Sequence, residues 1–236
     1  MSLPVELRLH ISEYVLTRDE PLVWYWSTYT RKRKIGTFVG LDQLTALVRV
    51  SQQLHSEIAM LAFKVNTSLF DWDQFGPEYR AGIKMKKERA QRIFKIREVS
   101  AAHRCFLQRF TGASLKVLRS IRFDVRLPFG AKERLQHLEI LACSAAQTPN
   151  AHVAIQYVDW FVKKTDEVYD GETNFGMEMN LEIGYRIART IASFGLDVPG
   201  RNWHVLPGSS SDYTAIKDHL EGEYLEDALR WHKLGI

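Results

Sequence analysis

Histidine and cysteine are the residue types in this 236-residue chain that could hold a metal ion or transfer a proton. The nearest approaches to a metal-ligand pattern are His103 with Cys105 and His137 with Cys143. A structural zinc site needs four ligands, and neither pair has an obvious second pair. The chain also lacks an HExxH helix motif and a GxSxG nucleophile turn. We therefore expect no metal, no cofactor and no catalytic residue of these kinds.

Two further patterns could support catalysis but have simpler interpretations. Glu178 and Glu182 would share one face of a helix, as paired catalytic carboxylates can, yet a solvated acidic face has the same spacing. Residues 195–200 (GLDVPG) lack the GK[ST] ending of a phosphate-binding loop. The sequence favours a protein that is not an enzyme, although catalytic groups assembled from distant loops leave no local motif.

Charge is distributed unevenly along the chain. Residues 80–134 hold 16 Lys and Arg against 4 Asp and Glu, whereas residues 166–236 hold 6 against 13. Clustered cations can bind a polyphosphate by releasing counterions, and short basic runs resemble nuclear import signals. Three alternatives stay open: a nucleic-acid interface, an acidic protein partner, or a solvated face paired with the acidic C-terminal third. The cations of this basic patch are Arg31, Lys32, Arg33, Lys34, Lys84, Lys86, Lys87, Arg89, Arg92, Lys95 and Arg97.

The elements that position these residues follow from hydrophobic periodicity and from turn residues. Helical spacing predicts helices over 4–16, 42–63, 78–110, 131–146 and 179–194, and a further helical segment after the capping residues 209–212. Aromatic and β-branched residues predict a hairpin of strands 21–30 and 35–39, with the first basic run at its tip. Further strands are expected over 66–72, 118–127 and 152–162, and loops over 171–176 and 195–208.

The expected fold class is α+β, with N-terminal helices and a β-hairpin followed by mixed helices and mainly antiparallel strands. We divide the chain into an N-terminal module, residues 1–75, and a partner-binding region, residues 76–236, which could share one core. No stretch approaches the roughly 18 consecutive apolar residues that span a bilayer, and residues 1–10 are charged where a signal peptide is apolar. We expect no membrane association and a cytoplasmic or nuclear location.

Two stretches carry a resemblance to a known family: residues 3–16 (LPVELRLHISEYVL) and residues 44–72. Together they resemble the N-terminal signature of a large fungal family of F-box-like proteins, in which a Leu-Pro-x-Glu-hydrophobic helix precedes a Leu-hydrophobic-Arg-Val helix and an Asn-Thr-x-x-Phe strand. Residues 106–123 resemble the following segment of that family more loosely. The matching residues are Leu3, Pro4, Glu6, Leu7, Ile11, Tyr14, Val15, Leu47, Arg49, Val50, Glu57, Phe63, Asn66, Thr67 and Phe70.

The resemblance implies a protein–protein interaction module. F-box helices dock on the Skp-type adaptor of cullin-RING ubiquitin ligases, and the rest of such a chain selects a substrate. A few apolar anchors on the helix faces would then supply most of the binding energy. The anchors expected here are Leu3, Pro4, Leu7, Ile11, Leu47, Val50 and Leu54. The alternative is that these side chains belong to the core of the fold, and the sequence leaves both possibilities open.

Overall fold

The computed structural model describes residues 4–29, 34–39, 41, 60–71, 88–109, 115–126, 131–157, 173–207 and 221–236. Within these ranges, only the backbone is described for residues 27–29, 34, 88–95 and 173–181. The described helices are α1 (Val5–Leu16), α4 (Leu61–Val65), α6 (Glu88–Leu107), α8 (Ala131–Ala145), α9 (Thr173–Ser193) and α11 (Gly222–Leu234). The strands are β1 (Leu22–Tyr29), β2 (Lys34–Phe38), β3 (Ser68–Asp71), β4 (Ser120–Val125), β5 (His152–Tyr157) and β6 (Trp203–Pro207).

The six described strands form one sheet in the order β2-β1-β3-β4-β5-β6. β1 and β2 pair antiparallel, which confirms the predicted hairpin. The other four pairings are parallel, so the expectation of mainly antiparallel strands was wrong, while the α+β class fits. The physical reason is that a helix separates each strand from β3 onward from the next, and a helical crossover returns the chain in the same direction.

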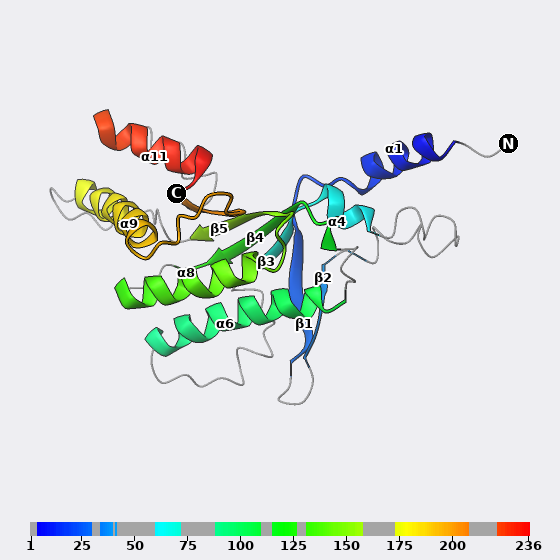
Figure 1. Ribbon diagram of the computed structural model, residues 1–236, viewed down its shortest axis with the longest axis horizontal. Helices are drawn as coiled ribbons and strands as arrows, with labels where there is room; N and C mark the ends of the chain where they lie inside the picture. The colour runs from blue at the N-terminus through cyan, green and yellow to red at the C-terminus, as the bar shows by residue number, and fades with distance from the viewer. Residues whose placement is uncertain are drawn as a thin grey trace.

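Helices cover one face of this sheet. Figure 1 shows α6 and α8 side by side along that face, and α9 lies next to α8. Side chains of β5 alternate accordingly: Val153, Ile155 and Tyr157 are buried toward the helices, whereas Ala154 and Gln156 are half-buried on the other face. α11 packs beside the edge strand β6, and the backbone of Ile236 exchanges two hydrogen bonds with Val205 there.

Aromatic rings fill the part of the core beneath the hairpin. The Phe38 and Phe106 ring centroids are 5.2 Å apart in an edge-to-face arrangement, and Trp24 contacts both rings. Such pairs add to the burial of their large apolar surfaces. The described core extends from Leu22 to Trp231 and includes residues from both predicted domains, whose boundary at residues 75 and 76 stays a prediction.

Most predicted elements agree with the structure to within a few residues, but two predictions were wrong. Of the loop predicted over residues 171–176, residues 173–176 belong to α9, which begins six residues before the predicted helix over 179–194. One strand was also missed. Residues 203–207 were placed in a loop, and they form the edge strand β6. Trp203, Val205 and Pro207 alternate with half-buried residues, which is a strand pattern, but glycines at 200 and 208 and the short length favoured a loop. Of the predicted helix over 42–63, residues 42–59 lie outside the described part.

Membrane insertion finds no support in the described helices, because none of them combines the length and the apolar character that a bilayer crossing requires.

Candidate functional site

Helix α1 carries an apolar stripe that faces away from the rest of the protein. Leu7, Ile11, Tyr14 and Val15 are 50%, 52%, 84% and 53% exposed. Their spacing of i, i+4, i+7 and i+8 places all four on one side of the helix. Water contact at so many large apolar side chains is unfavourable, and a contiguous exposed patch of this kind is typical of an interaction surface.

The opposite side of α1 attaches the helix to the body. Ser12 and Leu16 are buried, and Leu9 is partly buried on the same side. The neighbouring element is the short helix α4, whose Leu61, Ala62 and Phe63 are buried. Figure 1 shows α1 projecting from the sheet, with α4 next to the point where α1 joins it. The apolar stripe is thus turned outward because the other face of α1 is already occupied.

Asn66 links the ends of both helices. Its side chain is 4% exposed, and its Nδ2 donates hydrogen bonds to the carbonyl oxygens of Leu16 (2.7 Å) and Ala62 (2.8 Å). The backbone N–H of Arg18 donates to Asn66 Oδ1 at 2.8 Å. The last four carbonyl groups of a helix have no hydrogen-bond donor within the helix. This one amide provides a donor for carbonyl groups at the C-terminal ends of both α1 and α4.

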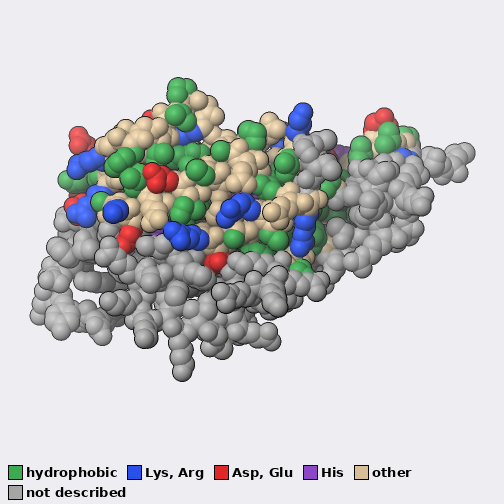
Figure 2. Space-filling model, turned by 60° about the horizontal axis from the view of Figure 1, so that its bottom comes forward, with side chains coloured by type: hydrophobic (Ala, Val, Ile, Leu, Met, Phe, Trp, Pro, Cys, Tyr) green, Lys and Arg blue, Asp and Glu red, His purple; other side chains and the backbone are tan. Residues whose placement is uncertain are grey.

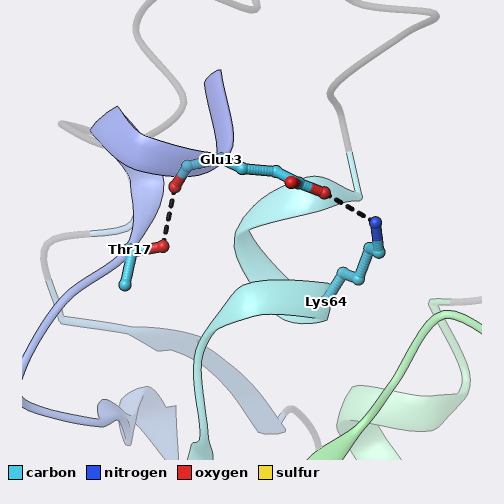
Figure 3. A network of polar contacts seen from close by, with 3 residues as sticks. All are labelled: Glu13, Thr17 and Lys64. Atoms are coloured by element: carbon cyan, nitrogen blue, oxygen red, sulfur yellow. Dashed lines mark hydrogen bonds and ion pairs between the residues drawn. The ribbon is translucent and has the colours of Figure 1, made fainter. Parts of the chain in front are cut away.

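A polar contact on the surface adds to this attachment, as Figure 3 shows. Lys64 Nζ of α4 lies 2.7 Å from Glu13 Oε1 of α1, and the Thr17 hydroxyl donates to the Glu13 carbonyl oxygen at 2.7 Å. The hydrogen bond and the charge of Lys64 lower the pKa of Glu13. Both ion-pair partners are well exposed, so the pair orients α1 more than it stabilises it.

The predicted anchors divide into two groups. Pro4, directly before α1, and Leu7 and Ile11 in α1 are exposed, so the alternative that Leu7 and Ile11 are core residues does not hold in this structure. Leu3, Leu47, Val50 and Leu54 lie outside the described residues. Tyr14 and Val15 belong to the same stripe, and their helical spacing from Leu7 and Ile11 predicted the helix, but they were not among the predicted anchors.

Little of the predicted basic patch falls within the described side chains. Arg31, Lys32, Arg33, Lys84, Lys86 and Lys87 lie outside the described residues, and only the backbone is described for Lys34, Arg89, Arg92 and Lys95. Arg97 is exposed on α6. On the face in Figure 2, the described Lys and Arg side chains are scattered among apolar, uncharged and acidic groups, with several of them toward the left end, and they form no continuous basic surface. A nucleic-acid interface through this patch therefore stays a prediction.

An ion pair lies on the face of the sheet opposite α6 and α8. Arg122 Nε is 2.9 Å from Asp124 Oδ1, and Arg122 Nη2 donates to Asp124 Oδ2 at 3.1 Å. Asp71 is the register partner of Asp124 on β3. Burial raises the pKa of Asp124 to about 6, a shift that Asp71 reinforces and Arg122 opposes. The result is a carboxyl group whose charge is costly in the folded state.

Asp124→Asn is expected to remove a pH dependence of stability. A pKa of about 6, above the ordinary 3.8, means that the folded state binds the proton more tightly than the unfolded state does. When the pH is lowered from 7.5 to 5, the free energy of unfolding of the wild type should therefore rise by about 1 kcal/mol relative to that of Asp124→Asn. Urea unfolding of both proteins at the two pH values measures this difference. If the free energies of unfolding of the two proteins differ by the same amount at both pH values, burial does not raise the pKa of this carboxyl group.

His204 lies on the same sheet as the Arg122–Asp124 pair but not beside it. His204 is the register partner of Ala154, which is the partner of Arg122, so one strand separates His204 from the Arg122–Asp124 pair by about 10 Å in total. Burial, His152 and Arg201 lower the pKa of His204 to about 4. Among the described residues, no group of three or more His, Cys, Asp or Glu side chains could hold a metal ion.

His103 is a buried base with no polar partner in the described part of the structure. It is fully buried on α6, its ring lies 5.2 Å from those of Phe70 and Phe123, and neither ring nitrogen has a hydrogen-bond partner. Burial lowers the pKa of His103 to about 3. Its surroundings are those of a core residue, so the pairing with Cys105 considered from the sequence provides no site.

The geometry of the described residues therefore offers one surface suited to recognition, the apolar stripe of α1 held in place through Asn66. Comparisons with protein-family models, with curated proteins and with solved structures find no match.

Proposed function

We propose that this chain is a non-enzymatic protein-recognition module that docks on a partner through the apolar stripe of α1, and that the partner is a Skp-type adaptor of a cullin-RING ubiquitin ligase. The observation that carries the proposal is the outward exposure of Leu7, Ile11, Tyr14 and Val15. The F-box-like resemblance of residues 3–16 and 44–72 supports the choice of partner. In this proposal, residues 76–236 select a substrate for the ligase.

The energetics of the stripe fit such docking. Fully burying an exposed Leu or Ile side chain contributes about 1.5–3 kcal/mol, so Leu7 and Ile11, which are half exposed, would each contribute about half of that on docking. A helix laid into an apolar groove uses anchors at this i, i+4, i+7 spacing. Tyr14, the most exposed of the four, combines a large apolar ring with a hydroxyl that can remain at the rim of an interface. Binding that depends on these side chains should be insensitive to salt, because it involves little charge.

The double substitution Leu7→Lys and Ile11→Lys tests the proposal. Two buried ammonium groups in an apolar groove cost far more than they gain, so the affinity for a recombinant Skp-type adaptor should fall at least about 100-fold. Both side chains are half exposed in the free protein, so the circular-dichroism spectrum and the urea midpoint should stay close to those of the wild type. Isothermal titration calorimetry at low and at high salt provides the affinities.

His10→Lys is the matched control, because it places the same side chain on the exposed surface of α1 at a residue that belongs neither to the apolar stripe nor to the family signature. Its affinity for the adaptor should remain within a few-fold of the wild type. The proposal fails if the wild type does not bind the adaptor, or if the double variant binds as well as His10→Lys. Binding to nucleic acid that is lost at high salt would instead favour the basic patch as the functional surface.

A further inference from the structure

We infer that Asn66 is the positioning residue of the α1 docking surface: its amide holds α1 on the protein, and without it α1 detaches while the sheet stays folded. The inference rests on the proposed function for the significance of α1, but the attachment itself is tested independently. Asn66 lies 50 residues from Leu16 in the chain, so its contact fixes a tertiary arrangement and not a local turn.

Within the described part of the structure, α1 is attached mainly at α4 and Asn66. The buried side chains of α1 are Ser12 and Leu16. The Glu13–Lys64 pair is exposed to solvent, and α4 is the main neighbour of α1 in the described structure. A helix of 12 residues is marginally stable in water by itself. Detachment of α1 should therefore also unfold it, which makes its amide hydrogens a direct measure of attachment.

Each hydrogen bond of Asn66 satisfies a backbone group that would otherwise lack a partner. Asn66→Asp keeps the shape of the side chain and an oxygen for the N–H of Arg18, but it turns an acceptor toward the carbonyls of Leu16 and Ala62. An unsatisfied buried backbone group is costly, and here the cost falls at the junction between α1 and the body. The substitution removes almost no apolar surface, so the core beneath the sheet is left intact.

The test is hydrogen exchange of the full-length chain followed by mass spectrometry at pH 7. In Asn66→Asp, the amides of residues 9–16 should exchange about 10- to 100-fold faster than in the wild type, while those of β4 and β5 change less than about 3-fold. A merely structural role would accelerate α1 and the sheet by the same factor. Equal acceleration, or unchanged exchange of α1, overturns the inference.

Asn202→Asp is the matched control, because Asn202 is a second amide with a comparable set of bonds far from α1. Its Nδ2 donates to the carbonyl oxygens of Ala145, Thr148 and Ala151 at the turn between α8 and β5. This variant should accelerate exchange around that turn and leave α1 at the wild-type rate. Acceleration of α1 by Asn202→Asp would also overturn the inference, because it would show that α1 follows the stability of the whole protein.

A second arm separates this inference from the proposed function. The Skp-type adaptor, added in excess, should slow the exchange of α1 amides in the wild type. If it does not, the proposed function fails, whereas the role of Asn66 is still decided by the comparison of the two Asp variants without adaptor.

Discussion

Replacing Gly36 with alanine should lower the free energy of unfolding by about 2–3 kcal/mol, although a Gly-to-Ala change at a neutral site in a strand is stabilising. A Cβ at position 36 would overlap the indole atoms Cζ2, Cε2 and Nε1 of Trp24. The ring has nowhere to move, because Trp26, Phe38, Phe70 and Phe106 surround it. Urea unfolding of both proteins measures the difference.

The environment of Trp24 also explains why the edge strand β2 has a glycine there. The guanidinium of Arg109 lies 5.3 Å from the Trp24 ring centroid, and its Nη2 donates to the carbonyl oxygen of Gly36. The ring thus contacts both the β2 backbone and a cation, and the face of an aromatic ring attracts positive charge. An aromatic ring covering a strand glycine compensates for the missing side chain.

The double variant Trp24→Phe and Gly36→Ala provides the control. Phenylalanine lacks the indole atoms that a Cβ at position 36 would overlap, so Gly36→Ala should cost less than about 1 kcal/mol in this background. The two substitutions should therefore be coupled by more than about 1 kcal/mol. An equal cost in both backgrounds would place the strain elsewhere than in the Trp24 ring.

His103→Leu should stabilise the protein, and increasingly so as the pH falls. The pKa of His103 is about 3 in the folded state and 6.5 when exposed, so only the unfolded state gains a proton between these values. The stability associated with neutral His103 is complete above pH 6.5 and is lost progressively below it. Removing an unpaired buried imidazole should raise the free energy of unfolding of His103→Leu by about 1 kcal/mol over that of the wild type. When the pH is lowered from 7.5 to 5, this advantage should grow by about 2 kcal/mol.

Only the difference between the two proteins isolates this effect, because other groups titrate in the same range. Asp124 acts in the opposite direction, since its raised pKa stabilises the folded state as the pH falls through 6. His204 acts in the same direction as His103 and is present in both proteins. A difference that stays constant from pH 7.5 to pH 5 would mean that His103 is protonated as readily in the folded state as in the unfolded state.

The sequence was sufficient to predict most of the described elements, but not the parallel pairing of β3, β4, β5 and β6. The period-two pattern of residues 118–127 and the helical spacing of residues 131–146 both predicted observed elements, because burial on one face leaves a periodic signature. Strand direction depends on the crossovers. The alternation of helices and strands in the second half was visible and is typical of parallel pairing, and giving it more weight would have corrected the prediction.

The candidate site shows a similar division. Apolar residues at 7, 11, 14 and 15 predicted an amphipathic helix, but the same pattern fits a face turned to the core or to solvent. The apolar face is turned to solvent because Asn66 and α4 occupy the other side of α1. These residues lie about 50 positions away in the chain. No local pattern reports that a single amide will join two helix ends, so this part could come only from the structure.

The order of the strands determines how strongly the two ends of the sheet, where α1 and α11 are attached, are coupled energetically. α1 is attached at α4 and Asn66, which directly precede β3 in the chain, and α11 packs next to β6. Two strands, β4 and β5, lie between β3 and β6. Three strand spacings separate β3 from β6 by about 14 Å, beyond the range over which substitutions usually interact. Substitutions at α1 and at α11 should therefore have additive effects on the free energy of unfolding. For the same reason, a molecule bound at one end should leave binding at the other end unchanged.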